Sequence, residues 1–297
     1  MYRLGIDIGG TKINIGIIKE NGKDISIVVS KKVEVKTVKD ATSEIKNAVV
    51  ALCKENGVEY TDIASCGVGI PGTVSRDGKK ILKVPNIAIL SENFAEELEA
   101  ALDIPVKMLQ DSRAAAWGEY KCGGGKGLDT VICMTLGTGI GTGIVINGKI
   151  YNGALLGAGE LGHIPVVEGG RPCGCGKRGC LEKYCAGGGF DITAREMLGE
   201  GNTAKELFEA ARQGRADAKK AIDDAVVTLG RAIVSAVNLL SPNCILFSGG
   251  LSAETEYLST LIEYVKEHCY SSSGELPILK KAELGALSPL VGAALYQ

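Results

Sequence analysis

The residues whose types and spacing could do chemistry are concentrated between Glu160 and Glu182, a segment of 23 residues. It holds one histidine and three cysteines, namely His163, Cys173, Cys175 and Cys180. One nitrogen and three sulfur donors form the tetrahedral set that closed structural zinc sites use. The glycines between the cysteines allow the chain to turn tightly, so that the sulfur atoms can face inward. The segment therefore predicts a bound zinc ion.

A carboxylate stands at each end of this segment. If the loop folds around a metal, Glu160 and Glu182 approach each other and become two acceptors for the hydroxyl groups of a small polar ligand. The alternative interpretation is that the cysteines are unrelated thiols and that His163 is an ordinary core residue. We favour the metal site because the chain has only two histidines and one of them lies at ligand spacing.

Two glycine-rich bends point to phosphate binding. The first, Gly-Gly-Thr-Lys at residues 9–12, follows Asp7 at the end of a predicted strand. Backbone N–H groups in such a bend approach an anion without hindrance from a Cβ atom. A Mg²⁺ ion between Asp7 and a phosphate would explain an acid at this place. A plain hairpin turn is the alternative, and it is less favoured because a second bend occurs at residues 137–143. Two such bends would hold a polyphosphate from opposite sides.

Two further motifs each allow a purely structural and a functional interpretation. Asp111 stands between a predicted strand at residues 105–109 and a predicted helix at residues 112–120. It could be the helix N-cap, or a general base that accepts the proton of a hydroxyl attacking phosphorus. Ser248, Gly249 and Gly250 lie between a predicted strand and a predicted helix. They could make a nucleotide contact or an ordinary turn.

The predicted elements alternate between strands and helices, which is typical of an α/β protein with mostly parallel central strands. Strands are expected near residues 2–8, 13–17, 25–35, 63–70, 105–109, 130–136, 144–146, 244–247 and 277–280. Helices are expected near residues 41–55, 92–102, 112–120, 216–240, 254–269 and 286–296. The order strand, glycine-rich bend, strand, Asn-Gly occurs twice, about 130 residues apart. We therefore expect two related domains.

Composition restricts the class of protein. With 297 residues, 45% hydrophobic and 23% charged, the chain has the make-up of a soluble globular protein with an ample core. A net charge of −2 gives no reason to expect nucleic acid or an anionic membrane as a partner. The beginning of the chain has neither the basic nor the apolar region of a signal peptide. We therefore expect a cytoplasmic protein whose ten cysteines are reduced.

Together these motifs closely resemble the ROK family (repressor, open reading frame, kinase) of bacterial sugar kinases and sugar-responsive repressors. The resemblance rests on the motifs above, with Gly118-Glu119 after Asp111, and it covers nearly the whole chain. It implies an actin-like, ribonuclease H-type fold of two α/β domains, with ATP and sugar in the cleft between them. We expect residues 1–112 and 286–297 to form the smaller domain, and residues 113–285 to form the larger one with the zinc site.

The resemblance also implies roles for individual residues. Zinc would be bound by His163, Cys173, Cys175 and Cys180. The sugar would be bound by Gln110, Asp111, Glu160, His163 and Glu182, with Asp111 as the catalytic base. ATP and Mg²⁺ would be bound by Asp7, Gly9, Gly10, Thr11, Lys12, Thr138, Gly139, Gly249 and Gly250. We also expect a homodimer or a higher homo-oligomer.

Two positions depart from the family pattern, because Gln110 and Arg113 stand where the family usually has asparagine. The first asparagine commonly binds a sugar hydroxyl, and a side chain one methylene longer leaves the choice of hexose open. Arg113 is expected to point to solvent, as a long cation on a helix usually does.

The resemblance leaves enzyme and repressor to be distinguished. Repressor members carry a winged-helix segment ahead of the first glycine motif, and here Asp7 is the seventh residue. We therefore expect an ATP-dependent hexose kinase, with glucose as the first choice of substrate. N-acetylmannosamine or another aldohexose such as allose is the alternative, and a non-catalytic sugar-binding regulator is the lesser one.

Overall fold

The structure is a computed structural model that describes residues 1–9, 13–22, 24–33, 41–84 and 91–296. The chain divides into two compact units. The first unit comprises Met1–Gly127, Ile150–Ala158 and Ala286–Gln297, and the second comprises Leu128–Lys149 and Gly159–Gly285. The first unit thus takes in the helix that follows residue 110 and the short segment 150–158. The domain limits expected from the sequence, at residues 112 and 285, stay a prediction.

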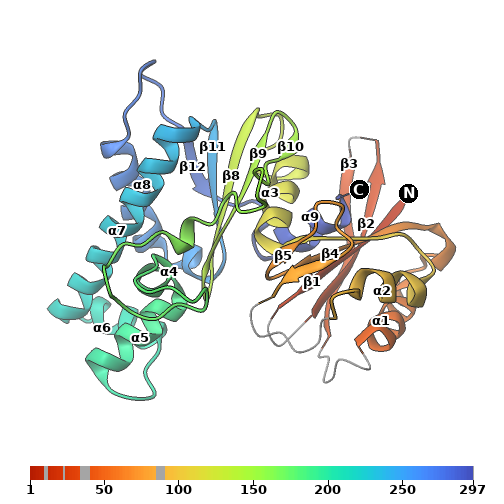
Figure 1. Cartoon of the computed structure of the whole chain (residues 1–297), viewed down its shortest axis with the longest axis horizontal. Coiled ribbons are helices and arrows are strands. Elements are labelled where there is room, and N and C mark those ends of the chain that lie inside the picture. Colours follow the sequence, from red (N-terminus) through yellow and green to blue (C-terminus); the bar gives the residue numbers. More distant parts are fainter. Residues whose placement is uncertain (10–12, 23, 34–40, 85–90, 297) are drawn as a thin grey trace. The chain divides into compact units, whose positions relative to one another are not determined.

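The first unit is built on a five-stranded sheet with the order β3-β2-β1-β4-β7 (Figure 1). Its strands are β1 (Tyr2–Ile8), β2 (Ile13–Asn21), β3 (Asp24–Val33), β4 (Ile63–Ile70) and β7 (Val106–Gln110). The strand β2 is antiparallel to both of its neighbours, β1 and β3, whereas β4 is parallel to both β1 and β7. The helices are α1 (Ala41–Glu55), α2 (Phe94–Leu102), α3 (Asp111–Cys122) and α9 (Ser288–Ala294). A small separate ribbon pairs β5 (Thr73–Val74) with β6 (Ile81–Lys83).

The second unit repeats this plan with the order β10-β9-β8-β11-β12. Its strands are β8 (Thr130–Leu136), β9 (Ile140–Ile146), β10 (Lys149–Ile150), β11 (Cys244–Ser248) and β12 (Ile278–Lys281). An antiparallel hairpin, β8–β9, is again followed by two parallel strands. The helices are α4 (Glu182–Cys185), α5 (Gly187–Leu198), α6 (Ala204–Arg212), α7 (Ala216–Leu240) and α8 (Thr255–His268). The repeat expected from the sequence is therefore confirmed as two sheets with the same strand order.

The alternation of side chains along β1 shows to which face of the first sheet Asp7 belongs. Leu4, Ile6 and Ile8 are buried in the core that the sheet shares with α1 and α2. Because successive side chains of a strand point to opposite faces, Gly5 and Asp7 belong to the other face. A Cβ atom on Gly5 would lie 2.3 Å from the carbonyl oxygen of Leu290, so α9 packs directly on the backbone of β1 there. Asp7 therefore shares the α9 side of the sheet.

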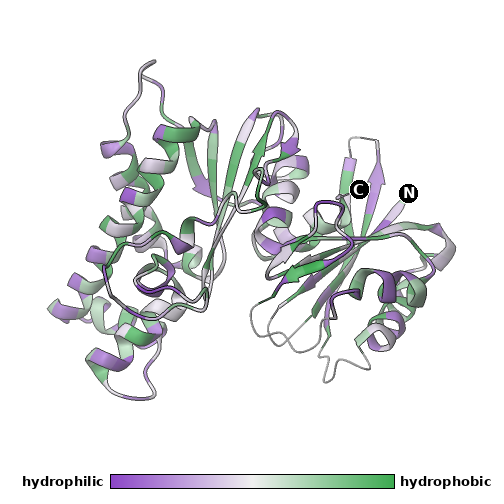
Figure 2. Cartoon of the chain, viewed as in Figure 1, coloured by the Kyte–Doolittle hydropathy of each residue, from purple (hydrophilic) through white to green (hydrophobic). Residues whose placement is uncertain are grey.

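Most predicted elements are confirmed. The helices expected at residues 41–55 and 216–240 and the strand expected at residues 63–70 coincide with α1, α7 and β4. In Figure 2 the central strand β11 is largely hydrophobic, while helices such as α7 and α8 carry hydrophilic and hydrophobic residues in turn, as helices with one buried side do. In the part of the chain that the structure describes, no helix combines the length and apolar character needed to cross a membrane.

Candidate active site

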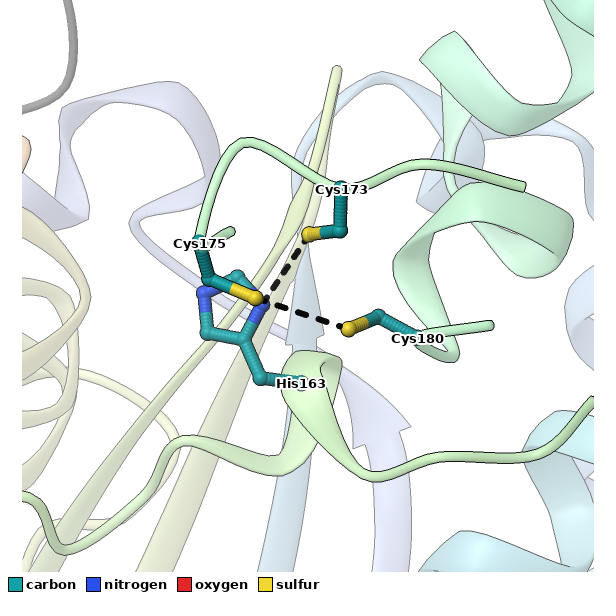
Figure 3. A group of neighbouring side chains, drawn as sticks. All are labelled: His163, Cys173, Cys175 and Cys180. Atoms are coloured by element: carbon teal, nitrogen blue, oxygen red, sulfur yellow. Dashed lines mark hydrogen bonds between the residues drawn. The ribbon is translucent and has the colours of Figure 1, made fainter. Parts of the chain in front are cut away.

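The four predicted zinc ligands come together in the second unit (Figure 3). One ligand atom from each of His163, Cys173, Cys175 and Cys180 lies within 4.8 Å of all the others. The Nδ1 atom of His163 is 3.6 Å from the sulfur of Cys173, and the sulfurs of Cys175 and Cys180 are also 3.6 Å apart. Zn–S bonds of about 2.3 Å in a tetrahedron place two sulfur atoms about 3.8 Å apart. The donor types and their spacing therefore fit a zinc ion.

Local backbone structure explains how this cluster forms. The short helix Leu161–His163 supplies the histidine, and isolated bridges at Pro165–Cys180 and Pro172–Arg178 fold the cysteine segment back on itself. Gly179 has φ +74°, and a Cβ atom there would lie 1.7 Å from the carbonyl oxygen of Val167. Only glycine can occupy this position without displacing the loop. Burial raises the pKa of the Cys173 thiol to about 12, and a bound dication would favour the thiolate instead.

Each of the two predicted sugar-binding carboxylates lies beside a different ligand residue of this cluster. The Oε1 atom of Glu182 accepts a hydrogen bond from the Cys173 thiol at 3.1 Å. The Oε2 atom of Glu160 is 3.8 Å from Nε2 of His163. Because the Nδ1 atom of His163 faces the sulfurs, its Nε2 atom is left on the Glu160 side. Contacts thus run from Glu160 to His163, from His163 to Cys173, and from Cys173 to Glu182. A carboxylate therefore lies next to two of the four predicted metal ligands.

The glycine-rich bend at residues 137–139 joins β8 to β9 and lies beside the same carboxylate. A Cβ atom on Gly139 would be 2.8 Å from Oε2 of Glu182. The amides of Gly187 and Gly188, at the start of α5, donate to the carbonyl oxygens of Gly137 and Thr138 at 2.8 and 3.0 Å. The bend is thus held by backbone contacts, and its neighbour is a residue expected to bind sugar.

Gly249 lies at the base of this bend. It follows β11, has φ +88°, and a Cβ atom there would be 2.5 Å from the carbonyl oxygen of Leu136, the last residue of β8. The short helix Gly250–Ala253 and then α8 follow. The predicted nucleotide contacts at Gly249 and Gly250 therefore follow the carboxyl end of β11, next to the carboxyl end of β8, which Thr138 and Gly139 follow.

In the first unit, Asp7 and Asp111 are electrostatically coupled. Burial first, and then the charge of Asp111, raise the pKa of Asp7 to about 7. Asp111 is the first residue of α3, whose N-cap is Gln110, and its Oδ1 atom accepts a hydrogen bond from the Ser112 amide at 2.6 Å. A carboxyl group whose pKa is raised by a neighbouring carboxylate favours a cation or a shared proton between the two groups. This pair is a suitable place for Mg²⁺ chemistry and for a general base.

The structure places the remaining predicted residues as follows. Gly9 is exposed after the end of β1. Gly10, Thr11 and Lys12 lie outside the described residues. The expectation that Arg113 points to solvent is wrong, because its side chain is buried and only 3% of the residue is exposed. It turns inward since its guanidinium group donates to the carbonyl oxygens of Leu156 and Ala158.

Two groups that support the site were not predicted from the sequence. Arg171 donates to the carbonyl oxygens of Lys183 and Gly189 at 2.8 and 3.1 Å, and its guanidinium group lies 5.0 Å from the centre of the Tyr184 ring. It thereby ties the segment that leads to Cys173 to the helices α4 and α5. The second group is the glycine run 187–189, which the Gly-Gly-Gly sequence could have disclosed as a close backbone approach.

Comparison with known proteins identifies the family. The model of the ROK family matches residues 3–297. The chain belongs to the ROK family. It is 34% identical to a glucokinase of Streptomyces coelicolor, over 98% of this chain and 96% of that protein. It is 28% identical to an N-acetyl-D-glucosamine kinase of Haemophilus influenzae, over 98% of this chain and 97% of that protein.

The solved structures of the ROK family agree with this assignment. The crystal structure of a ROK family glucokinase from Streptomyces griseus in complex with glucose and AMPPNP is 33% identical to this chain, with a TM-score of 0.81. The match covers 99% of this chain and 98% of that one. The two units, with their matching strand orders, form the actin-like two-domain fold of ROK sugar kinases.

Proposed function

We propose that this protein is an ATP-dependent hexose kinase that transfers the γ-phosphoryl group of ATP to a hydroxyl of glucose. The observation that carries the proposal is the Cys₃His cluster with Glu160 and Glu182 packed against it, in a ROK chain that keeps an acid at Asp111. The glucokinase relatives, one of them solved with glucose and an ATP analogue, support glucose as the substrate.

Each residue has a definite task in this proposal. Glu160, Glu182 and the Nε2 side of His163 bind and orient the sugar hydroxyls, since carboxylates accept from hydroxyl groups and a fixed polar set discriminates between sugars. Asp111 accepts the proton from the attacking hydroxyl. Asp7 and the glycine bends face the phosphates, where backbone amides can donate without obstruction. Mg²⁺, when bound, neutralises the charge that develops on the phosphoryl oxygens.

Zinc has a structural task. Held by His163, Cys173, Cys175 and Cys180, it would fix the loop whose ends carry the two sugar-binding carboxylates. It would also orient the imidazole ring of His163, because ligation through Nδ1 leaves Nε2 as the donor. A cytoplasmic location and a homodimer or higher homo-oligomer complete the proposal.

The direct test is a coupled assay that measures ATP consumption with Mg²⁺ and a panel of sugars. The panel contains glucose, mannose, allose, fructose, N-acetylglucosamine and N-acetylmannosamine. We expect glucose to give the highest kcat/KM. A higher kcat/KM for an N-acetylhexosamine would make that sugar the substrate in place of glucose, as the name of the N-acetyl-D-glucosamine kinase relative would suggest. No phosphorylation of any sugar, together with sugar binding by calorimetry, would favour a non-catalytic regulator.

A further inference from the structure

Arg113 is a buried cation on the first turns of α3, two residues after Asp111. Its Nη2 atom donates to the carbonyl oxygen of Leu156 at 2.6 Å and to that of Ala158 at 3.3 Å. Both acceptors belong to the segment 150–158, which is part of the first unit together with α3. A side chain expected on the surface thus holds a loop.

A second arginine binds the same loop from another direction. The Nη2 atom of Arg76, from the ribbon of β5 and β6, donates to the carbonyl oxygen of Ala154 at 3.1 Å. The loop also closes on itself, because the amide of Ala158 donates to the carbonyl oxygen of Asn152 at 3.2 Å. We call residues 152–158 the clasped loop. Three of its alternate carbonyl groups, at residues 154, 156 and 158, accept from guanidinium groups.

The clasped loop depends on these polar contacts. Leu156 has φ +61°, a left-handed conformation that side chains disfavour and that persists only where the surroundings impose it. Leu155, at the tip of the loop, is 93% exposed, so its side chain adds little packing. One bond from Arg113 falls on Leu156 itself, and the bonds to Ala154 and Ala158 lie on either side of this unfavourable residue.

The clasped loop also borders the proposed sugar-binding residue Gln110. One pocket of the first unit is lined by Leu109, Gln110, Arg113, Ile150, Leu156 and Tyr296. Arg113 fixes the Leu156 wall of this pocket by its hydrogen bond, and it forms part of the wall next to Gln110 itself. The chain then runs from Ala158, the second acceptor, to Glu160 within two residues.

We propose that Arg113 is a positioning residue that sets the sugar selectivity of this protein, an inference that rests on the proposed kinase function. By holding Leu156 and Ala158, it fixes the wall beside Gln110. The two positions where the chain departs from the family pattern, 110 and 113, therefore act together. Gln110 and Arg113 line the same small pocket, and in this proposal Arg113 acts on the sugar only through the wall beside Gln110.

The test compares Arg113→Met, which keeps the length and removes the donors, with Arg113→Lys, which keeps the charge and one donor group. Arg215→Met is the matched control, because Arg215 also donates to a backbone carbonyl, that of Met197, at 3.1 Å on the exposed surface. kcat and KM are measured for glucose, mannose and ATP. We expect Arg113→Met to lower kcat/KM for glucose on the order of 10- to 100-fold, mainly through KM, because a hydrogen bond from a charged group is lost.

The pattern of effects separates positioning from mere stability. We expect the glucose-to-mannose ratio of kcat/KM to change on the order of tenfold, KM for ATP to change less than about twofold, and Arg113→Lys to recover part of the loss. One common factor on both sugars and ATP would overturn the proposal, and so would an unchanged glucose-to-mannose ratio. If Arg113→Met does not fold, Arg113→Lys alone carries the comparison.

Hydrogen exchange keeps this test independent of the kinase assignment. Amides of residues 154–160 are followed in the wild type and in the Arg113 variants without substrate. Faster exchange in this segment, with little change elsewhere in the first unit, is the expected result. If the wild type phosphorylates no sugar, the proposed function fails, while faster exchange would still show that Arg113 holds the clasped loop. Unchanged exchange in Arg113→Met would show that Arg113 does not hold the clasped loop, whatever the kinase activity.

Discussion

The contact between the glycine bend and Glu182 leads to a sharp prediction for Gly139→Ala. The added Cβ would lie 2.8 Å from Oε2 of Glu182. Movement of the carboxylate away from the bend is opposed by the Lys183 ammonium, which lies 3.5 Å from its other oxygen. To reach an ordinary contact of about 3.4 Å, the carboxylate must move by about 0.6 Å.

This displacement should weaken sugar binding. Hydrogen bonds to a charged group contribute about 1.5–3 kcal/mol, and a shift of this size at Glu182 should forfeit about 1.5 kcal/mol of that. The expected result is a roughly tenfold higher Kd for glucose, since about 1.4 kcal/mol corresponds to a factor of ten. Glucose binding is measured by calorimetry without nucleotide, so that any effect on ATP does not enter.

Gly137→Ala is the matched control, because a Cβ at Gly137 meets no heavy atom within 4 Å among the described residues. It should bind glucose as the wild type does. A double-mutant cycle with Glu182→Gln extends the test, since two changes that act through one contact are not additive. Wild-type glucose affinity in Gly139→Ala, or full additivity in the cycle, would refute the inferred link between the bend and the sugar site.

Three further predictions concern the metal cluster and the acidic pair. Cys175→Ser should reduce the zinc content, measured by metal analysis, from about one equivalent per chain to well below it, and should lower the Tm; full zinc occupancy would contradict the assignment. Gly179→Ala should lower the Tm by roughly 5 °C and release zinc, because of its left-handed backbone and the collision with Val167, whereas Gly174→Ala, whose Cβ meets nothing within 4 Å, should not. In Mg²⁺-free buffer the raised pKa of Asp7 lowers the stability of the folded protein as the pH rises from about 4 through about 7. The Tm of Asp7→Asn should therefore exceed that of the wild type by an amount that grows over this range and then levels off. A difference in Tm that does not depend on pH would contradict this prediction.

The parts of the site that could be predicted from the sequence are those encoded locally. His163 and the three cysteines form one cluster because their chemistry and spacing lie within a single segment. The repeated strand, bend and strand pattern gave the two related sheets, because hairpins are set by near neighbours in the chain and by Asn-Gly turns such as Asn147-Gly148, which has positive φ at both residues.

What could not be predicted depends on partners far away in the chain. Arg113 finds its acceptors 43 and 45 residues later, in a loop whose conformation no short pattern specifies. Helix α5 begins with three glycines, which local propensity disfavours, and it forms because their backbones pack against the carbonyl groups of the 137–138 bend and of α4. The proposed role of Asp111 as general base stays a prediction, since its contact with the Ser112 amide suits a helix start as well.

The measurement that tests the central claim most directly is the turnover of Asp111→Asn with glucose and MgATP, taken together with its affinity for glucose. Removal of a general base typically costs on the order of 10² to 10⁴ in rate. We expect kcat to fall by that factor while the Kd for glucose stays within about threefold of the wild-type value, because Glu160, His163 and Glu182 remain in place. Turnover close to the wild-type value in a variant that binds glucose normally would contradict the account.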